Sequence, residues 1–483
     1  MTGGGSDGVA ADEVLAALAA AAAEAGAQVW LVGGLVRDRL LGRATLDLDA
    51  VVAGDPALLA RAVGRRAGGH AFELSEAFGA WRVVARDRRW QLDLLGLSGA
   101  AVEADLARRD LTINAIAEPL LAGGEPGPAI DPYGGVSDLR AGRLRMVSER
   151  SFSDDPLRVL RLARFAAQLG FIAEPATLAR ARESAAGLTE VAGERVFAEL
   201  RGVVCAPGVL TGLELMDEAG ATRAVLPELD ALHGVEQSRY HHLDVSGHTR
   251  ATLAETIALV EEPARLAADE QTAQALGAAL AQPLANELTR GQSLRFGALL
   301  HDIAKARTRA VSEEGRVSFW GHDKLGAEMS REILGRLRAS ERLQSYVAAL
   351  TRSHLRLGFL VHRAPLGRRE LYDYLLASAP VAVDVTLLSV ADRLATRGAN
   401  AERAIEAHLR LAAEVMPAAL AFEADPPRPP LRGDELAEAL GIVPGPRLGE
   451  LLAELQAAAY AGEIEGREDA LGLARELLAG GQP

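Results

Sequence analysis

The sequence predicts an α+β protein in which a small mixed α/β head precedes a largely helical remainder. Strand-like apolar segments occur early, at 46–52 and 90–96, whereas alanine and leucine, which favour helices, dominate the later part. The proline-rich stretch Pro426-Pro-Arg-Pro-Pro430 marks a late linker. We therefore expect a head at 1–145 that begins with a flexible tail (1–8), a helical neck at 146–225, a helical domain at 226–422, and a linker with a helical tail at 423–483.

Composition and charge restrict the class of protein. The chain has 483 residues, a net charge of −14 and one cysteine, Cys205, so no internal disulfide forms and a reducing compartment fits. The sequence has no uninterrupted apolar run of the ~18 residues that a membrane span needs. The alanine-rich run 16–23 lacks a basic leader and reads as a first helix. These features predict a cytoplasmic protein without a membrane partner, and they leave the oligomeric state unknown.

The first candidate site begins with a glycine pair. Gly33 and Gly34 remove side chains where a backbone can approach a phosphate, and Arg37 offers a guanidinium fork for phosphate oxygens. The segment 35–41 has helical spacing, and Gly42 can end that helix. This arrangement predicts a turn and short helix at a phosphate site.

Three aspartates follow on two expected strands. Asp47 and Asp49 are separated by one residue, so both point to the same face of the strand 46–52. Asp93 interrupts the apolar run of the strand 90–96. Aspartate is unfavourable inside strands, and three carboxylates together could hold two Mg²⁺ ions. The glycine turn, the arginine and the carboxylates indicate transfer of a nucleotide from a triphosphate.

Five ordered motifs carry a resemblance to a known family. They are LVGGLVRDRLLGRATLDLDAVV (31–52), RRDLTINA (108–115), DPYGGVSDL (131–139), DDPLRVLRLARF (154–165) and ERVFAE (194–199). Together they resemble class II tRNA nucleotidyltransferases (CCA-adding enzymes) and bacterial poly(A) polymerases. The resemblance implies a polymerase-beta-like nucleotidyltransferase head in which Asp47 and Asp49 bind Mg²⁺ and Asp93 is the third carboxylate. It further implies that the triphosphate contacts Gly33, Gly34 and Arg37, that ribose and phosphate contact Arg109 and Asp110, and that Asn114 supports the site.

A base-reading pair is predicted at 154–165. Asp155 and Arg158 are three apart, so on a helix that starts at Asp155-Pro156 they share a face. Carboxylate and guanidinium match the amine and ring nitrogen that cytosine and adenine both present, and they mismatch uracil and guanine. The family usually has Glu-Asp where this chain has Asp154-Asp155. Arg161 and Arg164 extend a cluster of arginines that we expect to contact phosphates despite the acidic total charge; the others are Arg140, Arg143, Arg145, Arg150 and Arg158.

A second candidate site is a set of histidines and aspartates past residue 240. We expect a metal to be held by His248, His301, Asp302, His322, His354 and Asp392. GALLHDIAK (297–305), on an apolar helix, GHDKLGAEM (321–329), SHLR (353–356) and ADRLATRG (391–398) resemble an HD-superfamily phosphohydrolase domain. Imidazole and carboxylate ligands suit a transition metal as well as Mg²⁺. His241 and His242 are either further site residues or surface residues.

The resemblances imply an enzyme that adds C, C and A, or part of that triplet, to tRNA 3′ ends from CTP and ATP. Within the class, the alternatives are a poly(A) polymerase and an A-adding or CC-adding specialist. An alternative of another class is an HD metal phosphohydrolase that acts on RNA ends or nucleotides. The tail (433–480) is expected to contact tRNA by analogy with HD-containing relatives.

Overall fold

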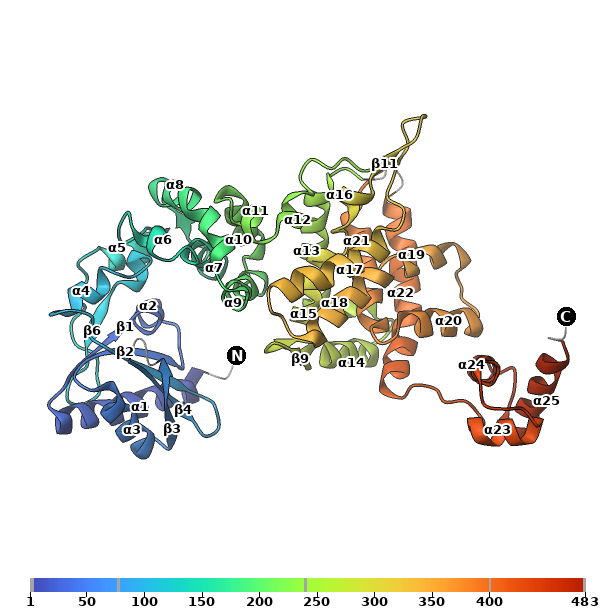
Figure 1. Cartoon of the computed structure of the whole chain (residues 1–483), viewed down its shortest axis with the longest axis horizontal. Helices are drawn as coiled ribbons and strands as arrows, with labels where there is room; N and C mark the ends of the chain where they lie inside the picture. Colours follow the sequence, from blue (N-terminus) through green and yellow to red (C-terminus); the bar gives the residue numbers. More distant parts are fainter. Residues whose placement is uncertain (1–3, 76–78, 239–240, 399–400, 481–483) are drawn as a thin grey trace. The chain divides into compact units, whose positions relative to one another are not determined.

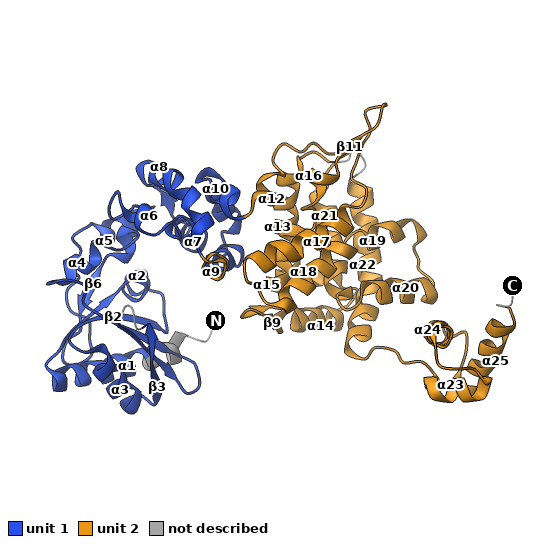
Figure 2. Cartoon of the chain, viewed as in Figure 1, with its two compact units in different colours: residues 1–191, 198–225 blue, residues 192–197, 226–483 orange. Residues whose placement is uncertain are grey.

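The computed structural model describes residues 4–75, 79–238, 241–398 and 401–480. The chain divides into two compact units (Figure 2). Unit 1 comprises residues 1–191 and 198–225, and unit 2 comprises 192–197 and 226–483. A mixed α/β head followed by helices confirms the predicted α+β fold class. The contacts do not separate the head from the neck, so the boundary at 145 stays a prediction.

A six-stranded sheet forms the head, in the order β3-β4-β5-β2-β1-β6. The strands are β1 Gln28–Val32, β2 Asp47–Ala53, β3 Gly69–Ser75, β4 Ala80–Ala85, β5 Gln91–Gly96 and β6 Ala117–Pro119. The β2–β5 pair is parallel, whereas its neighbours are antiparallel. Helices α1 Gly4–Ala25 and α3 Pro56–Arg66 pack on each other and on the sheet (Figure 1).

The local predictions around the first site are confirmed. The expected helix is α2 Gly34–Leu40, and Gly42, with a φ of 68°, follows its end. Both expected strands are present as β2 and β5. The predicted tail at 1–8 is wrong in part, because α1 already begins at Gly4; residues 1–3 lie outside the described part of the chain.

Helices and two short strands follow the sheet in unit 1. They are α4 Val102–Leu106, α5 Gly135–Ala141, β7 Arg143–Leu144, α6 Ser151–Asp154, α7 Arg158–Leu169, β8 Ile172–Ala173, α8 Pro175–Ser184, α10 Val209–Glu218 and α11 Ala221–Val225. Helix α9 Gly193–Val204 belongs to both units. α7 packs against α10 through a strongly amphipathic face, with Leu160 and Leu162 fully buried.

Unit 2 is a helical bundle. Its long helices are α13 Val245–Glu261, α14 Glu270–Ala281, α15 Arg290–Leu300, α17 His322–Arg336, α18 Glu341–Ser353, α20 Arg368–Ser378, α21 Ala382–Ala395 and α22 Ala401–Ala424. Shorter elements are α12 Pro227–Asp230, β9 Pro283–Ala285, β10 Leu288–Thr289, α16 Lys305–Thr308, α19 Arg356–Leu360 and the hairpin of β11 Ala310–Val311 with β12 Val317–Ser318. A buried ion triad of Arg290, Asp384 and Glu423 joins α15, α21 and α22.

The tail has its own apolar cluster. It contains α23 Gly433–Leu440, α24 Pro446–Ala461 and α25 Gly466–Ala479, with Leu436 and Leu455 fully buried between them. Tyr460 of α24 lies 5.0 Å from Tyr372 of α20, measured between ring centroids. No single helix among the described residues is long and apolar enough to cross a membrane; α20 and α21 pass that test only as a pair bent by 95°.

Candidate active site and metal centre

The three predicted carboxylates lie on adjacent strands. β2 and β5 run parallel in a register that places Asp49 opposite Asp93. Leu48 is buried between the two aspartates of β2, so Asp47 and Asp49 share the other face, as predicted. Asp47 is exposed, whereas Asp49 is half-buried.

Arg82 joins this group, although no sequence pattern predicted it. It lies opposite Asp93 in the antiparallel β4–β5 register. Its Nε and Nη2 donate to the two oxygens of Asp93, each at 2.7 Å. This fork holds the Asp93 carboxylate in one orientation beside Asp49.

The pKa of Asp49 is unusually high for a carboxylate. Burial, followed by the neighbouring charge of Asp93, raises the pKa of Asp49 to about 6. Arg109 opposes this rise. A carboxylate whose charge is poorly compensated by the protein is suited to a divalent cation.

The glycine pair lies against these groups. Gly33 has a φ of +66°, and a Cβ there would lie 2.9 Å from Nη1 of Arg109 and 3.5 Å from Oδ2 of Asp49. A Cβ on Gly34 would lie 3.7 Å from Nη2 of Arg37. The structure therefore brings Gly33, Gly34, Arg37, Asp49 and Arg109 into one place, as the motif predicts.

Asp110 and Asn114 form a buried hydrogen-bonded link between Arg37 and α7. Arg37 donates to Oδ1 of Asn114 at 3.0 Å, and Nδ2 of Asn114 donates to Asp110 at 3.0 Å. Nε of Arg161 donates to the other oxygen of Asp110 at 2.7 Å. Burial alone would raise the pKa of Asp110, but Arg161 and Asn114 hold it well below its usual range. Asp110 is 5% exposed, so in this conformation it links α7 to Arg37 and does not offer an open contact for ribose.

Three arginine side chains lie against the ring of Phe165 in α7. No sequence pattern predicted this arrangement. The guanidinium carbons of Arg37, Arg161 and Arg164 lie 5.0, 5.5 and 4.5 Å from its ring centroid. Nε of Arg164 also donates to Glu199 at 2.6 Å, on the helix predicted to brace this segment. An aromatic face attracts cations, so Phe165 helps to fix these side chains.

The expected helix start at Asp155-Pro156 is displaced. Asp155 has extended backbone dihedrals between α6 and α7, and its carboxylate accepts from N of Leu157 at 3.2 Å. Helix α7 begins at Arg158, which donates to the backbone oxygens of Ser151 and Arg108 at 2.9 and 2.7 Å. The prediction that both residues lie on one helix is therefore wrong, because Asp155 precedes Pro156 and has the extended backbone that a residue before proline favours.

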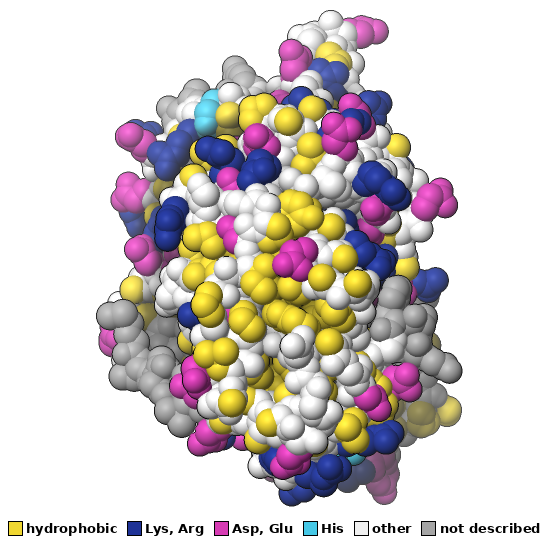
Figure 3. All heavy atoms as spheres, turned by 90° about the vertical axis from the view of Figure 1, so that its left-hand side faces the viewer, with side chains coloured by type: hydrophobic (Ala, Val, Ile, Leu, Met, Phe, Trp, Pro, Cys, Tyr) yellow, Lys and Arg dark blue, Asp and Glu magenta, His cyan; other side chains and the backbone are white. Residues whose placement is uncertain are grey.

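The predicted arginine cluster is not a uniformly free basic patch. Carboxylates of the same unit pair with several of its members, namely Arg143, Arg145, Arg150, Arg161 and Arg164. Figure 3 shows Lys and Arg side chains interspersed with Asp and Glu around hydrophobic side chains on the face that it displays. Any phosphate contact in this region must therefore compete with these ion pairs.

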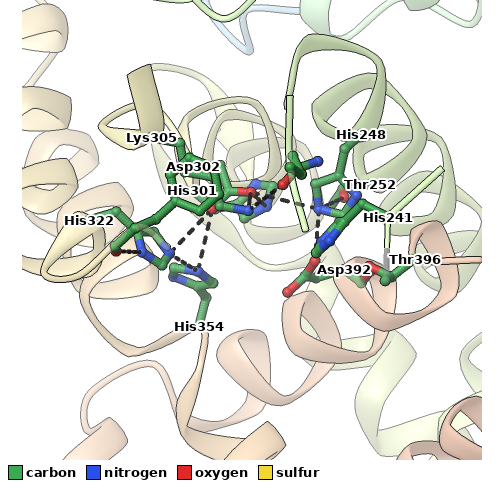
Figure 4. A network of polar contacts seen from close by, with 12 residues as sticks. His241, His248, Thr252, His301, Asp302, Lys305, His322, His354, Asp392 and Thr396 are labelled. Carbon is green, nitrogen blue, oxygen red and sulfur yellow. Dashed lines mark hydrogen bonds and ion pairs between the residues drawn. The ribbon is translucent and has the colours of Figure 1, made fainter. Parts of the chain in front are cut away.

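The histidine set assembles around one buried carboxylate in unit 2. Asp302 is 1% exposed, and His322 and His354 direct Nε2 toward its Oδ1 at 3.4 and 3.7 Å. Nε2 of His301 lies 3.1 Å from its Oδ2. Nε2 of His248 lies 2.9 Å from Asp392 and 3.7 Å from Asp302 (Figure 4). All six predicted residues thus meet, although α15 ends at Leu300 and places His301 and Asp302 in the following turn.

Backbone carbonyls orient three of the imidazoles. Nδ1 of His301, His322 and His354 lies 2.7–2.8 Å from the carbonyl oxygen three residues earlier. These contacts fix the ring orientations, with Nε2 of each imidazole directed toward Asp302.

The protonation states favour a metal. Burial, followed by the neighbouring His301, lowers the pKa of His354 to about 4. Although burial opposes it, His301 and Lys305 hold the pKa of Asp302 well below its usual range. Oδ1 of Asp302 is buried without a hydrogen-bond partner among the described residues. A neutral His354 beside an ionised carboxylate whose Oδ1 lacks a hydrogen-bond partner belongs to a donor set that fits a divalent cation.

The ligand atoms fall into two triplets. Within each triplet the atoms lie within 4.8 Å of one another: His248, His301 and Asp392 in the first, and Asp302, His322 and His354 in the second. The described part of unit 1 contributes no such triplet. His241, which the sequence left open, has its ring centroid 5.1 Å from that of His248.

Comparisons with known proteins match the head, the neck and the helical domain to known families. Residues 29–145 match the family described as "Poly A polymerase head domain", 170–232 match "Probable RNA and SrmB- binding site of polymerase A", and 275–397 match the HD domain family. The fold and these matches define a nucleotidyltransferase head joined to an HD domain.

Similarity to proteins of known activity specifies the family of this nucleotidyltransferase. The chain is 37% identical to the A-adding tRNA nucleotidyltransferase of Deinococcus radiodurans over 90% of this chain and 92% of the relative. It is 34% identical to the CC-adding tRNA nucleotidyltransferase of Thermus thermophilus over 94% and 95%. It is 37% identical to the Multifunctional CCA protein of Halorhodospira halophila over 69% and 74%. The chain belongs to the tRNA nucleotidyltransferase family and is an enzyme that transfers nucleotides.

Solved structures share the fold. A CCA-adding enzyme in complex with ATP superposes with a TM-score of 0.64 at 20% identity, covering 97% of this chain and 95% of that one. The Thermotoga maritima CCA-adding enzyme complexed with tRNA gives 0.59 at 20% identity, over 96% and 95%.

Proposed function

We propose that this tRNA nucleotidyltransferase adds one part of the CCA triplet, either A alone or the two C residues, to the tRNA 3′ end. The observation that carries this proposal is similarity over nearly the whole length of two specialists, A-adding and CC-adding, whereas the multifunctional relative covers 69% of the chain. The substrates are tRNA and CTP or ATP, and pyrophosphate is released.

The head residues have distinct tasks in this proposal. Asp47 and Asp49 would hold Mg²⁺, which supplies positive charge to the triphosphate and to the attacking 3′-hydroxyl. Arg37 and Arg109, beside the glycine pair, bind triphosphate oxygens. Asp93, fixed by Arg82, keeps the electrostatic field at Asp49 negative.

Base selection rests on Asp155 and Arg158. Arg158 contacts the backbone of Arg108, next to Arg109, so the base-reading residue is connected to the triphosphate contacts. A carboxylate acceptor and a guanidinium donor match C and A and leave U and G with unpaired polar groups.

Incorporation assays test this function. Purified protein, Mg²⁺ and each labelled nucleoside triphosphate are offered to tRNA ending before CCA, after C and after CC, and to an unrelated RNA. Addition of A only after CC, or of C only before it, supports the proposal. C followed by A assigns complete CCA addition, and long A tails on any RNA assign a poly(A) polymerase; either result contradicts it.

We also propose a metal-dependent phosphohydrolase activity at the histidine site, because six candidate ligand residues meet there and Oδ1 of Asp302, one of the six, has no hydrogen-bond partner among the described residues. Bound metal would polarise a phosphate and supply hydroxide. Hydrolysis of a chromogenic phosphodiester with Mn²⁺ or Ni²⁺ tests it. Asp49→Ala should abolish incorporation and spare hydrolysis, whereas Asp302→Ala should do the opposite. Hydrolysis that survives Asp302→Ala would contradict the assignment.

A further inference from the structure

An open cleft of about 740 Å³ lies beside the histidine site. Its lining includes His322, the hairpin residues Arg316 and Val317, and residues at the start of α19. This volume lies within the range of small-molecule sites, which is about 300–1,000 Å³. His322 and Lys305 of the lining already have roles at the histidine site, but no ligand has been assigned to the cleft.

Two aromatic side chains of the lining are largely in solvent. Trp320 is 88% exposed and Phe359 is 72% exposed. A single exposed aromatic residue needs no explanation, but two on one cleft provide planar apolar surface that a flat ligand can cover. Nucleobases stack on such side chains whatever their sequence.

The same lining is cationic. It contains Lys305, Arg316, Arg352 and Arg356, against a single carboxylate, Asp323. Asp302 pairs with Lys305, and Asp323 pairs with Arg352.

Two of these cations have spare capacity for an anion. No ion pair to Arg316 or Arg356 occurs within the described residues, and Nε of Arg356 is buried there without a hydrogen-bond partner. A guanidinium with unused donors is suited to phosphate oxygens.

We propose that this cleft binds a single unpaired nucleotide, with the base stacked on Trp320 and Phe359 and the phosphate held by Arg316 and Arg356. The ligand is either a free nucleotide or the single-stranded end of an RNA. The proposal rests on the proposed phosphohydrolase activity in one respect, since a nucleotide bound here would lie next to His322. The binding itself requires no metal.

Calorimetric titration of the full-length protein in EDTA tests the proposal, with AMP, a short single-stranded oligoadenylate and inorganic phosphate as probes. Trp320→Ala should weaken binding of AMP or the oligoadenylate by about fivefold to a hundredfold, the usual range for loss of one stacking residue. Trp320 is largely exposed, so this variant should fold normally. Arg356→Gln should also weaken binding. Phe72→Ala, which removes a 40% exposed aromatic residue of the head, is the control.

Each outcome has one meaning. Binding of AMP that depends on Trp320 supports a free nucleotide, and Trp320-dependent binding of the oligoadenylate alone supports an RNA end. Unchanged affinity in Trp320→Ala, no binding, or phosphate bound as tightly as AMP would overturn the proposal. Binding that persists in Trp320→Ala but disappears in Gly33→Ala belongs to the head and would also overturn it. Phosphodiester hydrolysis, measured separately with metal, shows independently whether the histidine site is active.

Discussion

Asp49 and Asp93 face each other across the parallel strands β2 and β5, but only Asp93 is neutralised within the protein. Arg82 binds both oxygens of Asp93, whereas Asp49 remains with a raised pKa. The protein therefore leaves one carboxylate electrostatically unsatisfied at the position where the proposed function requires a metal ligand.

Replacing this carboxylate should stabilise the metal-free protein. The pKa of Asp49 is about 6 in the folded state, above its ordinary value of 3.8. The unfolded state therefore ionises first, and ionisation disfavours folding as pH rises between these values. Asp49→Asn should thus raise the free energy of unfolding relative to the original chain by up to about 3 kcal/mol above pH 6, and by little below pH 4. Thermal or urea unfolding in EDTA across this pH range measures the difference.

Mg²⁺ provides the control for that experiment. The ion should raise the melting temperature of the original chain at pH 7 and leave that of Asp49→Asn nearly unchanged. A pH-independent stability difference between the two proteins would show that Asp49 does not titrate in this range.

Gly33 should be required for activity beyond its backbone conformation. Gly33 and Gly42 have nearly equal φ values, +66° and +68°, but a Cβ on Gly33 meets Arg109 whereas one on Gly42 meets nothing within 4 Å. Both alanine variants should lose stability because φ is positive, and Gly33→Ala carries the added strain of a ψ of −129°, which lies outside the left-handed α region. Only Gly33→Ala should displace Arg109 and raise KM for the nucleoside triphosphate, measured by incorporation. Equal kinetic effects in both variants would assign the defect to backbone strain.

The sequence predicted the residues that are close along the chain or follow a strand period. The face shared by Asp47 and Asp49 follows from a period of two, and the turn of Gly33 follows from a motif. Arg82 was missed because its role depends on the pairing of β4 with β5, which no local pattern specifies. Asp155 was misplaced because the residue before a proline is restricted to extended backbone, so the helix begins only after Pro156.

The histidine site shows the same limit. Its six ligands were predicted from motif resemblance, but their division into two triplets required the packing of α13, α15, α17, α18 and α21. The sequence could not decide whether His241 belongs to the site, because the loop before α13 brings its ring close to that of His248. Phe165 reads in sequence as one more apolar residue of α7, and only the fold shows the three arginines around it.

Phe165 should therefore influence nucleotide binding without touching the nucleotide. Phe165→Leu keeps an apolar side chain but removes the aromatic face against which Arg37, Arg161 and Arg164 lie. Each cation–π contact contributes about 0.5–2 kcal/mol, so KM for the nucleoside triphosphate should rise about tenfold with a smaller change in kcat. Phe152→Leu, at a fully buried phenylalanine of the same unit, is the matched control for lost packing. Similar KM values in the two variants would contradict the proposed role of Phe165 in positioning the arginines.

Asp302 should control metal content without affecting incorporation. Its carboxylate lies within 3.7 Å of four imidazole nitrogens, so Asp302→Asn removes the central charge while keeping the side chain's shape. We expect metal bound per chain, measured by elemental analysis after dialysis against Mn²⁺, to fall at least tenfold, because the triplet of Asp302, His322 and His354 loses its only carboxylate. His408→Gln is the control, since His408 is buried with its pKa lowered to about 4, chiefly by burial, but belongs to neither triplet. Its metal content should match that of the original chain.

Both variants should retain incorporation, because Asp47 and Asp49 supply the metal site of the head. Loss of incorporation in Asp302→Asn, with the protein still folded by circular dichroism, would contradict the separation of the two sites.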